Sequence, residues 1–314
     1  MRVAFLDDYQ QVALGLCPLP DGAEAVAFAD HVADPEALGA RLAGFDAVVA
    51  MRERTPFPAE VLRRLPDLRL LVTTGMRNAS IDVGAATAAG ITVCGTGGTS
   101  GRASTTEHTW ALLFALARRI PQQDAAIRAG GWQLGLGTVL AGKTLGLVGL
   151  GNLGAAMVPV AQALGMRVTA WSRNLTAERA AEIGVTALGH DEFFAGADVV
   201  SVHLVLSERS VGTVGAAELA LMKPGALLVN TSRGPIVDER ALLDALESGA
   251  LGGAAIDVYD REPLPPEHPL RRAPNTVLAP HTGYVSRESY TEYFADVADD
   301  VRAFLAGAPV RVLS

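Results

Sequence analysis

Short apolar runs alternate with amphipathic segments in the N-terminal part of the chain. Segments with helical spacing of apolar residues lie at Pro35–Leu42, Ala59–Leu65 and Val83–Ala89. Alternation of this kind predicts a parallel α/β sheet, although no glycine-rich turn directly follows its first run. The apolar runs expected to be its strands are Val3–Leu6, Ala25–Phe28, Ala47–Ala50, Leu70–Thr73 and Ile91–Cys94.

The same alternation resumes further along the chain and predicts a second sheet. Gly95–Gly101 has the composition of a linker, and a long helix is expected over Ser104–Arg119, with Thr105 or Thr106 near its cap and Ile120 on its apolar stripe. Apolar runs with helices between them then predict a doubly wound sheet. The strands expected in it are Thr144–Val148, Arg167–Trp171, Val199–Leu204, Ala226–Asn230, Gly253–Asp257 and Thr276–Ala279.

The C-terminal segment indicates that the first domain is discontinuous. A last helix is expected over about Ser286–Ala306, and the tail Pro309–Leu313 can return to the first sheet as a strand. We therefore expect an α/β protein with two Rossmann-like domains: residues 1–100 plus 285–314 as a flavodoxin-like substrate domain, and 101–284 as a dinucleotide-binding domain. The cleft between them is the expected active site.

Composition limits the classes of partner. The 314 residues are 49% hydrophobic and 19% charged, which is typical of a soluble globular protein, and the net charge of −8 argues against nucleic-acid or anionic-membrane partners. No apolar run is long enough for a signal peptide or a membrane span, so we expect a cytoplasmic protein. Cys17 and Cys94 are expected to be reduced and buried, and no cluster of side chains has the spacing of a metal site.

A glycine-rich turn joins two elements of the second sheet. The stretch KTLGLVGLGNLG at 143–154 passes from an apolar run into a turn, and Ala155–Leu164 after it has helical spacing. Gly149 permits the turn, Gly151 lets backbone N–H groups approach a pyrophosphate, and Gly154 lets the helix pack close to the strand. Since a helix start attracts anions, we expect this turn, Asn152 and Leu153 included, to bind a dinucleotide; the alternative is a glycine turn with a structural role alone.

Four segments give the chain its resemblance to the D-isomer-specific 2-hydroxyacid dehydrogenase family. They are GLGNLG at 149–154, NTSRG at 230–234, DVYDREP at 257–263 and PHTG at 280–283. Their order and spacing, together with the two-domain layout, cover the whole chain. The resemblance implies a nicotinamide cofactor, a small 2-keto or 2-hydroxy acid as substrate, and a homodimer built through the nucleotide domains. The segment Ile127–Leu140 is a candidate dimerisation arm.

The resemblance also implies three catalytic residues. Arg233 follows the strand Ala226–Asn230, and its paired N–H donors suit both a carboxylate and a polarised carbonyl oxygen. His281 is the implied acid/base, since an imidazole with its ordinary pKa near neutrality can give or take the hydroxyl proton, and Glu262 is the carboxylate that orients it. The alternatives are a surface arginine and a structural histidine.

Other residues take implied roles in binding. Arg52 is either a substrate contact or a solvated loop arginine, and His203 lines the cofactor pocket through its backbone, whereas His31, His108, His190 and His268 have no supporting neighbours in the sequence. The loop at 74–78 resembles one whose N–H groups hold the substrate carboxylate, which makes Thr74, Gly75 and Met76 substrate-binding residues with Arg233 and His281. The remaining implied cofactor contacts are Leu204, Thr231, Ser232, Asp257, Gly283 and Thr105.

One departure from the family pattern concerns the choice of cofactor. NAD-specific members carry an acid at the end of the second nucleotide-domain strand, where it binds the ribose 2′-OH. Here Trp171 is followed by Ser172, Arg173 and Asn174, and no acid occurs before Glu178. Serine and arginine would bind a 2′-phosphate, so we expect NADP(H) to be favoured over NAD(H). In the alternative reading Arg173 only stacks on adenine and both cofactors work.

Two hypotheses for the function remain. The first is an NAD(P)-dependent D-2-hydroxyacid dehydrogenase that reduces a small 2-keto acid, of the glyoxylate or hydroxypyruvate reductase type. The second is a non-enzymatic, nucleotide-sensing regulator on the same fold, similar to the corepressors related to this family. The presence of Arg233, Glu262 and His281 together favours the enzyme.

Overall fold

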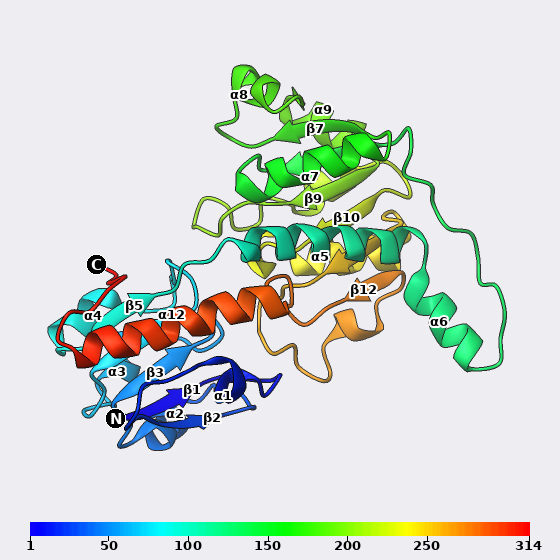
Figure 1. The fold of residues 1–314 in the computed structure, drawn as a ribbon. Helices are drawn as coiled ribbons and strands as arrows, with labels where there is room; N and C mark the ends of the chain where they lie inside the picture. The colour runs from blue at the N-terminus through cyan, green and yellow to red at the C-terminus, as the bar shows by residue number, and fades with distance from the viewer. The chain divides into compact units, whose positions relative to one another are not determined.

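The computed structural model describes residues 1–314 and divides into two compact units. The first consists of Met1–Ser100 and Val285–Ser314, and the second of Gly101–Tyr284. Each unit is an α/β structure built on a parallel sheet (Figure 1). No helix in either unit is long and apolar enough to cross a membrane.

The first unit is built on a five-stranded sheet with the order β2-β1-β3-β4-β5. Its inner strands β3 and β4 are buried throughout, which explains why they are apolar at every position except Thr73. Asp34 and Asp82 cap α2 and α4 by accepting backbone N–H groups. The strands are β1 (Arg2–Phe5), β2 (Glu24–Ala27), β3 (Ala47–Ala50), β4 (Leu70–Thr73) and β5 (Thr92–Gly95); the helices are α1 (Ala13–Leu16), α2 (Pro35–Leu42), α3 (Ala59–Leu62), α4 (Val83–Ala88) and α12 (Arg287–Leu305).

The last helix, α12, contacts two separate stretches of its unit: residues 97–100, at the end of the first segment, and the C-terminal tail. Three carboxylates lie one turn apart on α12. Glu292 accepts the N–H groups of Thr99 (2.8 Å) and Ser100 (3.1 Å), and Asp296 accepts that of Gly97 (2.7 Å). Asp300 pairs with Arg311 at 3.0 Å. The C-terminal tail then reaches β5, where Val312 forms an antiparallel bridge to Cys94.

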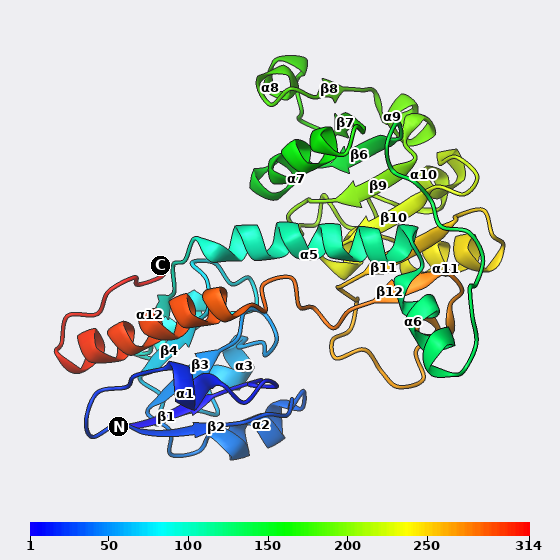
Figure 2. The ribbon, with the colours of Figure 1, turned by 45° about the vertical axis from the view of Figure 1, so that its right-hand side comes forward.

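The second unit is built on a seven-stranded parallel sheet with the order β12-β11-β10-β9-β6-β7-β8 (Figure 2). The order reverses on the two sides of β6, and open sheets of this kind bind ligands at the carboxyl ends of the strands beside such a point. The strands are β6 (Thr144–Val148), β7 (Arg167–Trp171), β8 (Thr186–Ala187), β9 (Val199–Val202), β10 (Leu227–Asn230), β11 (Gly253–Ile256) and β12 (Thr276–Leu278).

Helices cover both faces of this sheet, and the strand side chains alternate between two cores. Leu227 and Val229 face the core made with α5 and α7, whereas Leu228 faces the core made with α9, α10 and α11. The helices are α5 (Ser100–Ala117), α6 (Ile120–Arg128), α7 (Asn152–Ala163), α8 (Ala177–Glu182), α9 (His190–Gly196), α10 (Ala216–Leu221) and α11 (Glu239–Glu247), with short 3₁₀ turns at Gly234–Ile236 and Pro269–Arg272.

Some expected elements differ from those observed. The long helix begins at Ser100, so the hydroxyls of Thr105 and Thr106 donate to carbonyls one turn earlier instead of capping it. It ends at Ala117, because Arg119 takes a left-handed conformation (φ 56°), and Ile120 opens α6 with 54% of its surface exposed. The six strands expected in the second sheet are joined by a seventh, β8. Cys17 and Cys94 are free and buried, as expected.

Candidate active site

The glycine-rich turn connects β6 to α7, and its three glycines meet different surroundings. Gly149 has φ 98°, and a Cβ added to it would lie 2.9 Å from the carbonyl oxygen of His203. A Cβ on Gly154 would lie 2.2 Å from the carbonyl oxygen of Gly149. A Cβ on Gly151 would meet nothing within 4 Å. Packing therefore requires Gly149 and Gly154, whereas Gly151 leaves open space before the first-turn amides of α7, which fits a pyrophosphate.

A pocket of about 270 Å³ lies beside this turn in the second unit. Trp171 and Leu204 give it apolar surface, and Arg173 and Arg209 give it positive charge, while no Asp or Glu lines it. Arg209 was not among the residues expected from the sequence to bind the cofactor. Its position shortly after the strand that ends near Leu204 indicates such a place. The full lining is Trp171, Ser172, Arg173, Asn174, Leu204, Val205, Ser207, Arg209, Ser210 and Thr213.

His203 ties the end of β9 to the glycine-rich turn. Its N–H donates to the carbonyl oxygen of Val148 (2.8 Å), and its ring Nε2 lies 2.9 Å from the Oγ of Ser201. Burial lowers the pKa of His203 to about 4, so the ring is neutral near pH 7. A neutral imidazole held this way supports the turn through its backbone and carries no charge into the pocket.

The loop after β10 holds Arg233. Asn230, which is buried, accepts the N–H of Ser232 (3.0 Å) and donates its amide to the carbonyl oxygen of Arg233 (3.0 Å). The Oγ of Ser232 donates to the carbonyl oxygen of Leu204, and the Oγ1 of Thr231 lies 2.8 Å from that of Thr109 on α5. These bonds fix the backbone from which the Arg233 side chain extends.

His281 and Glu262, which are 19 residues apart in the chain, are in direct contact. The Nδ1 of His281 lies 2.6 Å from the Oε2 of Glu262, and the Oε1 of Glu262 accepts the N–H of Tyr259 at 2.9 Å. Both carboxylate oxygens of Glu262 are therefore engaged. With Nδ1 held, the Nε2 of His281 is the ring nitrogen available for proton transfer with a substrate.

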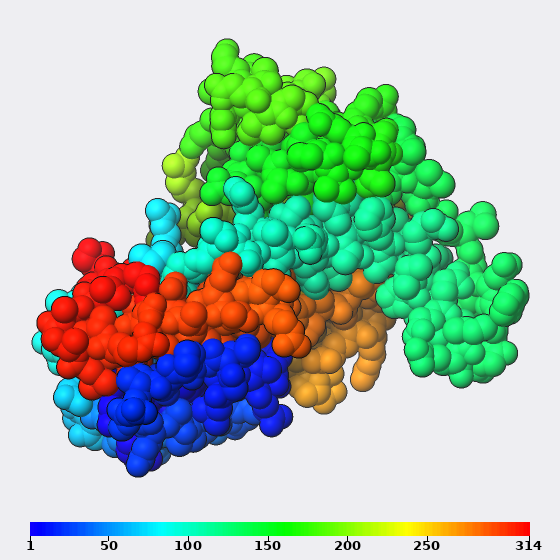
Figure 3. Space-filling view, in the orientation of Figure 1, coloured from blue at the N-terminus to red at the C-terminus, as the bar shows by residue number.

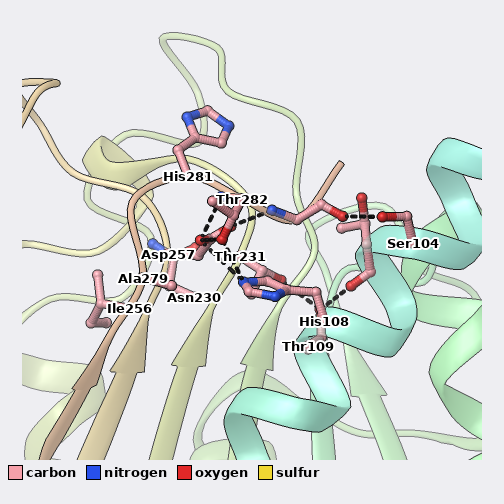
Figure 4. Close-up of polar contacts among 12 residues, drawn as sticks. Ser104, His108, Thr109, Asn230, Thr231, Ile256, Asp257, Ala279, His281 and Thr282 are labelled. Carbon is pink, nitrogen blue, oxygen red and sulfur yellow. Dashed lines mark hydrogen bonds and ion pairs between the residues drawn. The ribbon is translucent and has the colours of Figure 1, made fainter. Parts of the chain in front are cut away.

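Asp257 organises the segment that carries His281 (Figure 4). Its carboxylate, with the residue only 1% exposed, accepts the N–H groups of Thr282 (2.8 Å) and Gly283 (3.0 Å). Its backbone oxygen accepts the N–H of His281 at 2.7 Å. The Nε2 of His108, on α5, lies 3.1 Å from the same carboxylate. That Asp257, Thr105 and Gly283 contact the cofactor stays a prediction.

Four histidines have no supporting neighbours in the sequence, but each lies near a carboxylate in the fold. Besides His108, each of the other three lies next to a carboxylate from a segment distant in the sequence, which the sequence alone could not bring into contact. The pairs are His31 with Asp7 (2.8 Å), His190 with Glu218 (3.1 Å) and His268 with Glu239 (2.9 Å).

The first unit brings together Arg52 and the loop that follows β4. Arg52 has φ 53° and donates its N–H to the Oγ1 of Thr74 (2.9 Å), and its Nη1 would lie 2.1 Å from a Cβ added to Gly75. The N–H groups of Thr74 and Gly75 bind Ala50 (3.0 Å) and Thr96 (2.8 Å). In this loop the N–H groups of Met76, Arg77 and Asn78 make no hydrogen bond within the unit.

Comparisons with known proteins agree with this geometry. A model described as "D-isomer specific 2-hydroxyacid dehydrogenase, NAD binding domain" matches residues 110–283. D-3-phosphoglycerate dehydrogenase of Archaeoglobus fulgidus is 37% identical over 85% of this chain and 51% of its own. Glyoxylate reductase of Aeropyrum pernix is 38% identical over 79% of this chain and 76% of its own. The structure of a phosphoglycerate oxidoreductase from Vibrio cholerae is 38% identical, with a TM-score of 0.92 over 98% of this chain and 100% of that one.

The lengths of these relatives differ. The chain spans about half the length of the phosphoglycerate dehydrogenases it matches, and about three quarters of the glyoxylate reductase. The matched model covers most of the second unit and includes both the glycine-rich turn and the pair of His281 with Glu262. On this agreement of sequence, fold and site, the chain belongs to the D-isomer-specific 2-hydroxyacid dehydrogenase family of NAD-binding oxidoreductases.

Proposed function

We propose that the protein reduces a small 2-keto acid to the D-2-hydroxy acid with NADPH, in the manner of a glyoxylate or hydroxypyruvate reductase. The observation that carries the proposal is the 2.6 Å contact between the Nδ1 of His281 and Glu262, in the same unit as the Arg233 loop and the glycine-rich turn. Phosphoglycerate dehydrogenase and glyoxylate reductase are both among the relatives, so a phosphorylated acid is the second candidate substrate.

The proposed chemistry divides between the cofactor and three side chains. When bound, the nicotinamide supplies the hydride that reduces the carbonyl carbon. Arg233 binds the substrate carboxylate and polarises the carbonyl oxygen through its N–H donors. The Nε2 of His281 donates the proton that the new hydroxyl requires, and Glu262 keeps Nδ1 engaged so that Nε2 faces the substrate. Oxidation runs the same steps in reverse.

In the first unit, we assign substrate binding to Arg52 and the loop of Thr74, Gly75 and Met76. Because the N–H groups of Thr74 and Gly75 already have partners, the amides of Met76 and Arg77 are the donors proposed for the substrate carboxylate. The close packing of Arg52 on Gly75 holds its guanidinium at the same loop. A carboxylate bound there would gain charge-assisted hydrogen bonds.

The preference for NADP(H) rests on the charge of the pocket beside the glycine-rich turn. Ser172, Arg173 and Arg209 all line it, and no acid does. An acidic residue would repel a 2′-phosphate, whereas arginines bind it through several N–H donors. Asn174 and Ser207 add neutral hydrogen-bonding groups.

A spectrophotometric assay tests the proposal. The absorbance of the reduced nicotinamide is followed with glyoxylate, hydroxypyruvate, pyruvate, bulkier 2-keto acids and a phosphorylated 2-keto acid, each with NADPH and NADH. We expect turnover with a small 2-keto acid and a higher kcat/KM for NADPH. Binding of the dinucleotide without turnover across the panel would instead favour a nucleotide-sensing regulator.

We also propose a homodimer formed through the second unit. The helix α6 and the segment after it stand out from the rest of their unit (Figure 3) and expose large apolar side chains, among them Trp132 (73% exposed) and Leu136 (93%). Exposed apolar surface of this kind marks an interaction site. Light scattering tests the proposal. The parent protein should have the mass of two chains, and the double variant Trp132→Ser with Leu136→Ser should shift toward the mass of one chain. A parent protein with the mass of one chain would contradict the proposal.

A further inference from the structure

A histidine outside the proposed catalytic set contacts the residue that holds the His281 segment. His108 lies on α5, and its Nε2 is 3.1 Å from the Oδ1 of Asp257 and 3.5 Å from the Oγ1 of Thr282. Figure 4 shows the imidazole of His108 directed at the Asp257 carboxylate, whereas the ring of His281 points away from this cluster. His108 therefore does not share the proton-transfer site of His281.

Asp257 holds the backbone of the segment that carries His281. Asp257 binds three consecutive residues: the N–H of His281 through its backbone oxygen, and those of Thr282 and Gly283 through its carboxylate. His281 itself has φ 54°, a left-handed conformation that a residue with a side chain adopts only when its surroundings impose it. The orientation of the His281 ring thus depends on the placement of the Asp257 carboxylate.

Two further groups lie against that carboxylate: the hydroxyl of Thr282, 3.4 Å from Oδ1, and the Nε2 of His108, 3.1 Å from the same oxygen. A buried carboxylate is stable where hydrogen-bond donors surround it, and loss of one donor allows it to rotate or to admit water. The donors from Thr282 and Gly283 belong to the segment that the carboxylate positions, so they cannot fix it independently. His108 comes from a different element, the helix α5, and is the donor that anchors the carboxylate to the rest of the unit.

The same helix also touches both catalytic loops. The Oγ of Ser104 donates to the carbonyl oxygen of Gly283 (2.9 Å), and the Oγ1 of Thr109 lies 2.8 Å from that of Thr231, two residues before Arg233. Ser104 and His108 are one helical turn apart, and Thr109 directly follows His108. The helix α5 thus contacts both the segment that carries His281 and the loop that carries Arg233.

We propose that His108 is a positioning residue for the reaction: by donating to Asp257 it fixes the backbone of His281–Gly283 and thereby aims the Nε2 of His281. This inference rests on the proposed acid/base role of His281.

The test compares His108→Leu with His108→Gln in the full-length protein loaded with NADPH. Leucine fills the space without a donor, whereas glutamine keeps an N–H donor without the imidazole. Since misplacement by about 1 Å can cost about 100-fold in rate, we expect His108→Leu to lower kcat by about 10- to 100-fold. His108→Gln should recover most of that loss. Glu107→Gln is the matched control, because Glu107 is the exposed neighbour on the same helix.

The readouts separate positioning from general damage. The proposal expects kcat to fall by a larger factor than the affinity for NADPH, followed by fluorescence, while the melting temperature changes little. A kcat for His108→Leu within about twofold of the parent would overturn it, as would a Gln variant as slow as the Leu variant. So would a loss of NADPH affinity that matches the loss of kcat.

A parallel His281→Ala variant distinguishes failure of the inference from failure of the proposed function. If His281→Ala is inactive and His108→Leu is normal, only the role of His108 is wrong. If His281→Ala retains normal turnover, the acid/base assignment is wrong and the inference about His108 fails with it.

Discussion

The choice between NADPH and NADH tests the charge of the pocket beside the glycine-rich turn. Arg173 and Arg209 line this pocket from two different loops, after β7 and after β9, and no carboxylate lines it with them. Arg173→Ala and Arg209→Ala each remove one guanidinium without removing pocket backbone. We expect both to lower kcat/KM for NADPH and to leave kcat/KM for NADH nearly unchanged.

The magnitude follows from the exposure of the two arginines. A hydrogen bond to a charged group is worth about 1.5–3 kcal/mol, and the lower end applies because both side chains are exposed to solvent. Since 1.4 kcal/mol corresponds to a factor of ten, each variant should lose about tenfold with NADPH. The double variant should lose somewhat less than 100-fold, because the two guanidinium groups would share one phosphate.

Steady-state kinetics with both cofactors at two salt concentrations provide the assay. Salt should raise the KM for NADPH in the parent, because it screens the attraction between the two arginines and the 2′-phosphate. It should have less effect in the double variant, which lacks both guanidinium groups. Arg179→Ala is the matched control: it removes the same charge from α8, where Arg179 pairs with Glu182 at 2.8 Å. A parent protein that prefers NADH, or variants that leave the NADPH to NADH ratio unchanged, would refute the reasoning.

Three further predictions concern the reacting residues, the glycine-rich turn and a buried acid. His281→Ala and Arg233→Ala should each lower kcat/KM by about 10²- to 10⁴-fold in steady-state kinetics while the Kd for NADPH stays similar, and near-normal turnover would remove the assignment. Gly151→Ala should keep the parent's melting temperature because its Cβ meets no protein atom, but that Cβ would occupy the space proposed for the pyrophosphate and weaken dinucleotide binding. Gly154→Ala should have a lower melting temperature because its Cβ would lie 2.2 Å from a carbonyl oxygen. Equal melting temperatures for the two variants would contradict this. Burial raises the pKa of the Asp300 carboxyl to about 7, although the neighbouring Arg311 guanidinium lowers it. The native state therefore holds this proton more tightly than the unfolded chain does. Urea denaturation should therefore show stability falling as the pH rises from about 4 through about 7, and Asp300→Asn should flatten that fall; a parallel pH dependence in both proteins would exclude Asp300 as its source.

The strands of both sheets were predictable because most are buried on both faces. A strand in that position is apolar at nearly every residue, so β3 and β4 occur within the bounds that their apolar runs predicted. The two-residue strand β8 at the edge of the second sheet has too few residues to form a pattern. It forms only by pairing with β7, and this contact arises from the tertiary fold.

The start of α5 shows a second limit of the sequence. Hydroxyls at Thr105 and Thr106 suggested a cap, but Glu292, far along the chain, accepts the N–H groups of Thr99 and Ser100 instead. The same limit hid the partner of His108, which is Asp257. Local patterns report which residue types are present, whereas caps and buried ion pairs depend on segments that only the fold brings together.

The four segments of the family resemblance are spread through the chain, yet backbone contacts join them in the order of the strands. Gly149 packs on the carbonyl of His203, and Leu204 beside it accepts the hydroxyl of Ser232. A Cβ on Gly234 would lie 2.1 Å from the carbonyl carbon of Tyr259, whose N–H in turn holds Glu262. Each segment therefore limits the position of the next, from the dinucleotide turn to the partner of His281. The spacing of these motifs reflects one continuous edge of a parallel sheet, and this explains why glycines recur where a side chain would separate neighbouring segments.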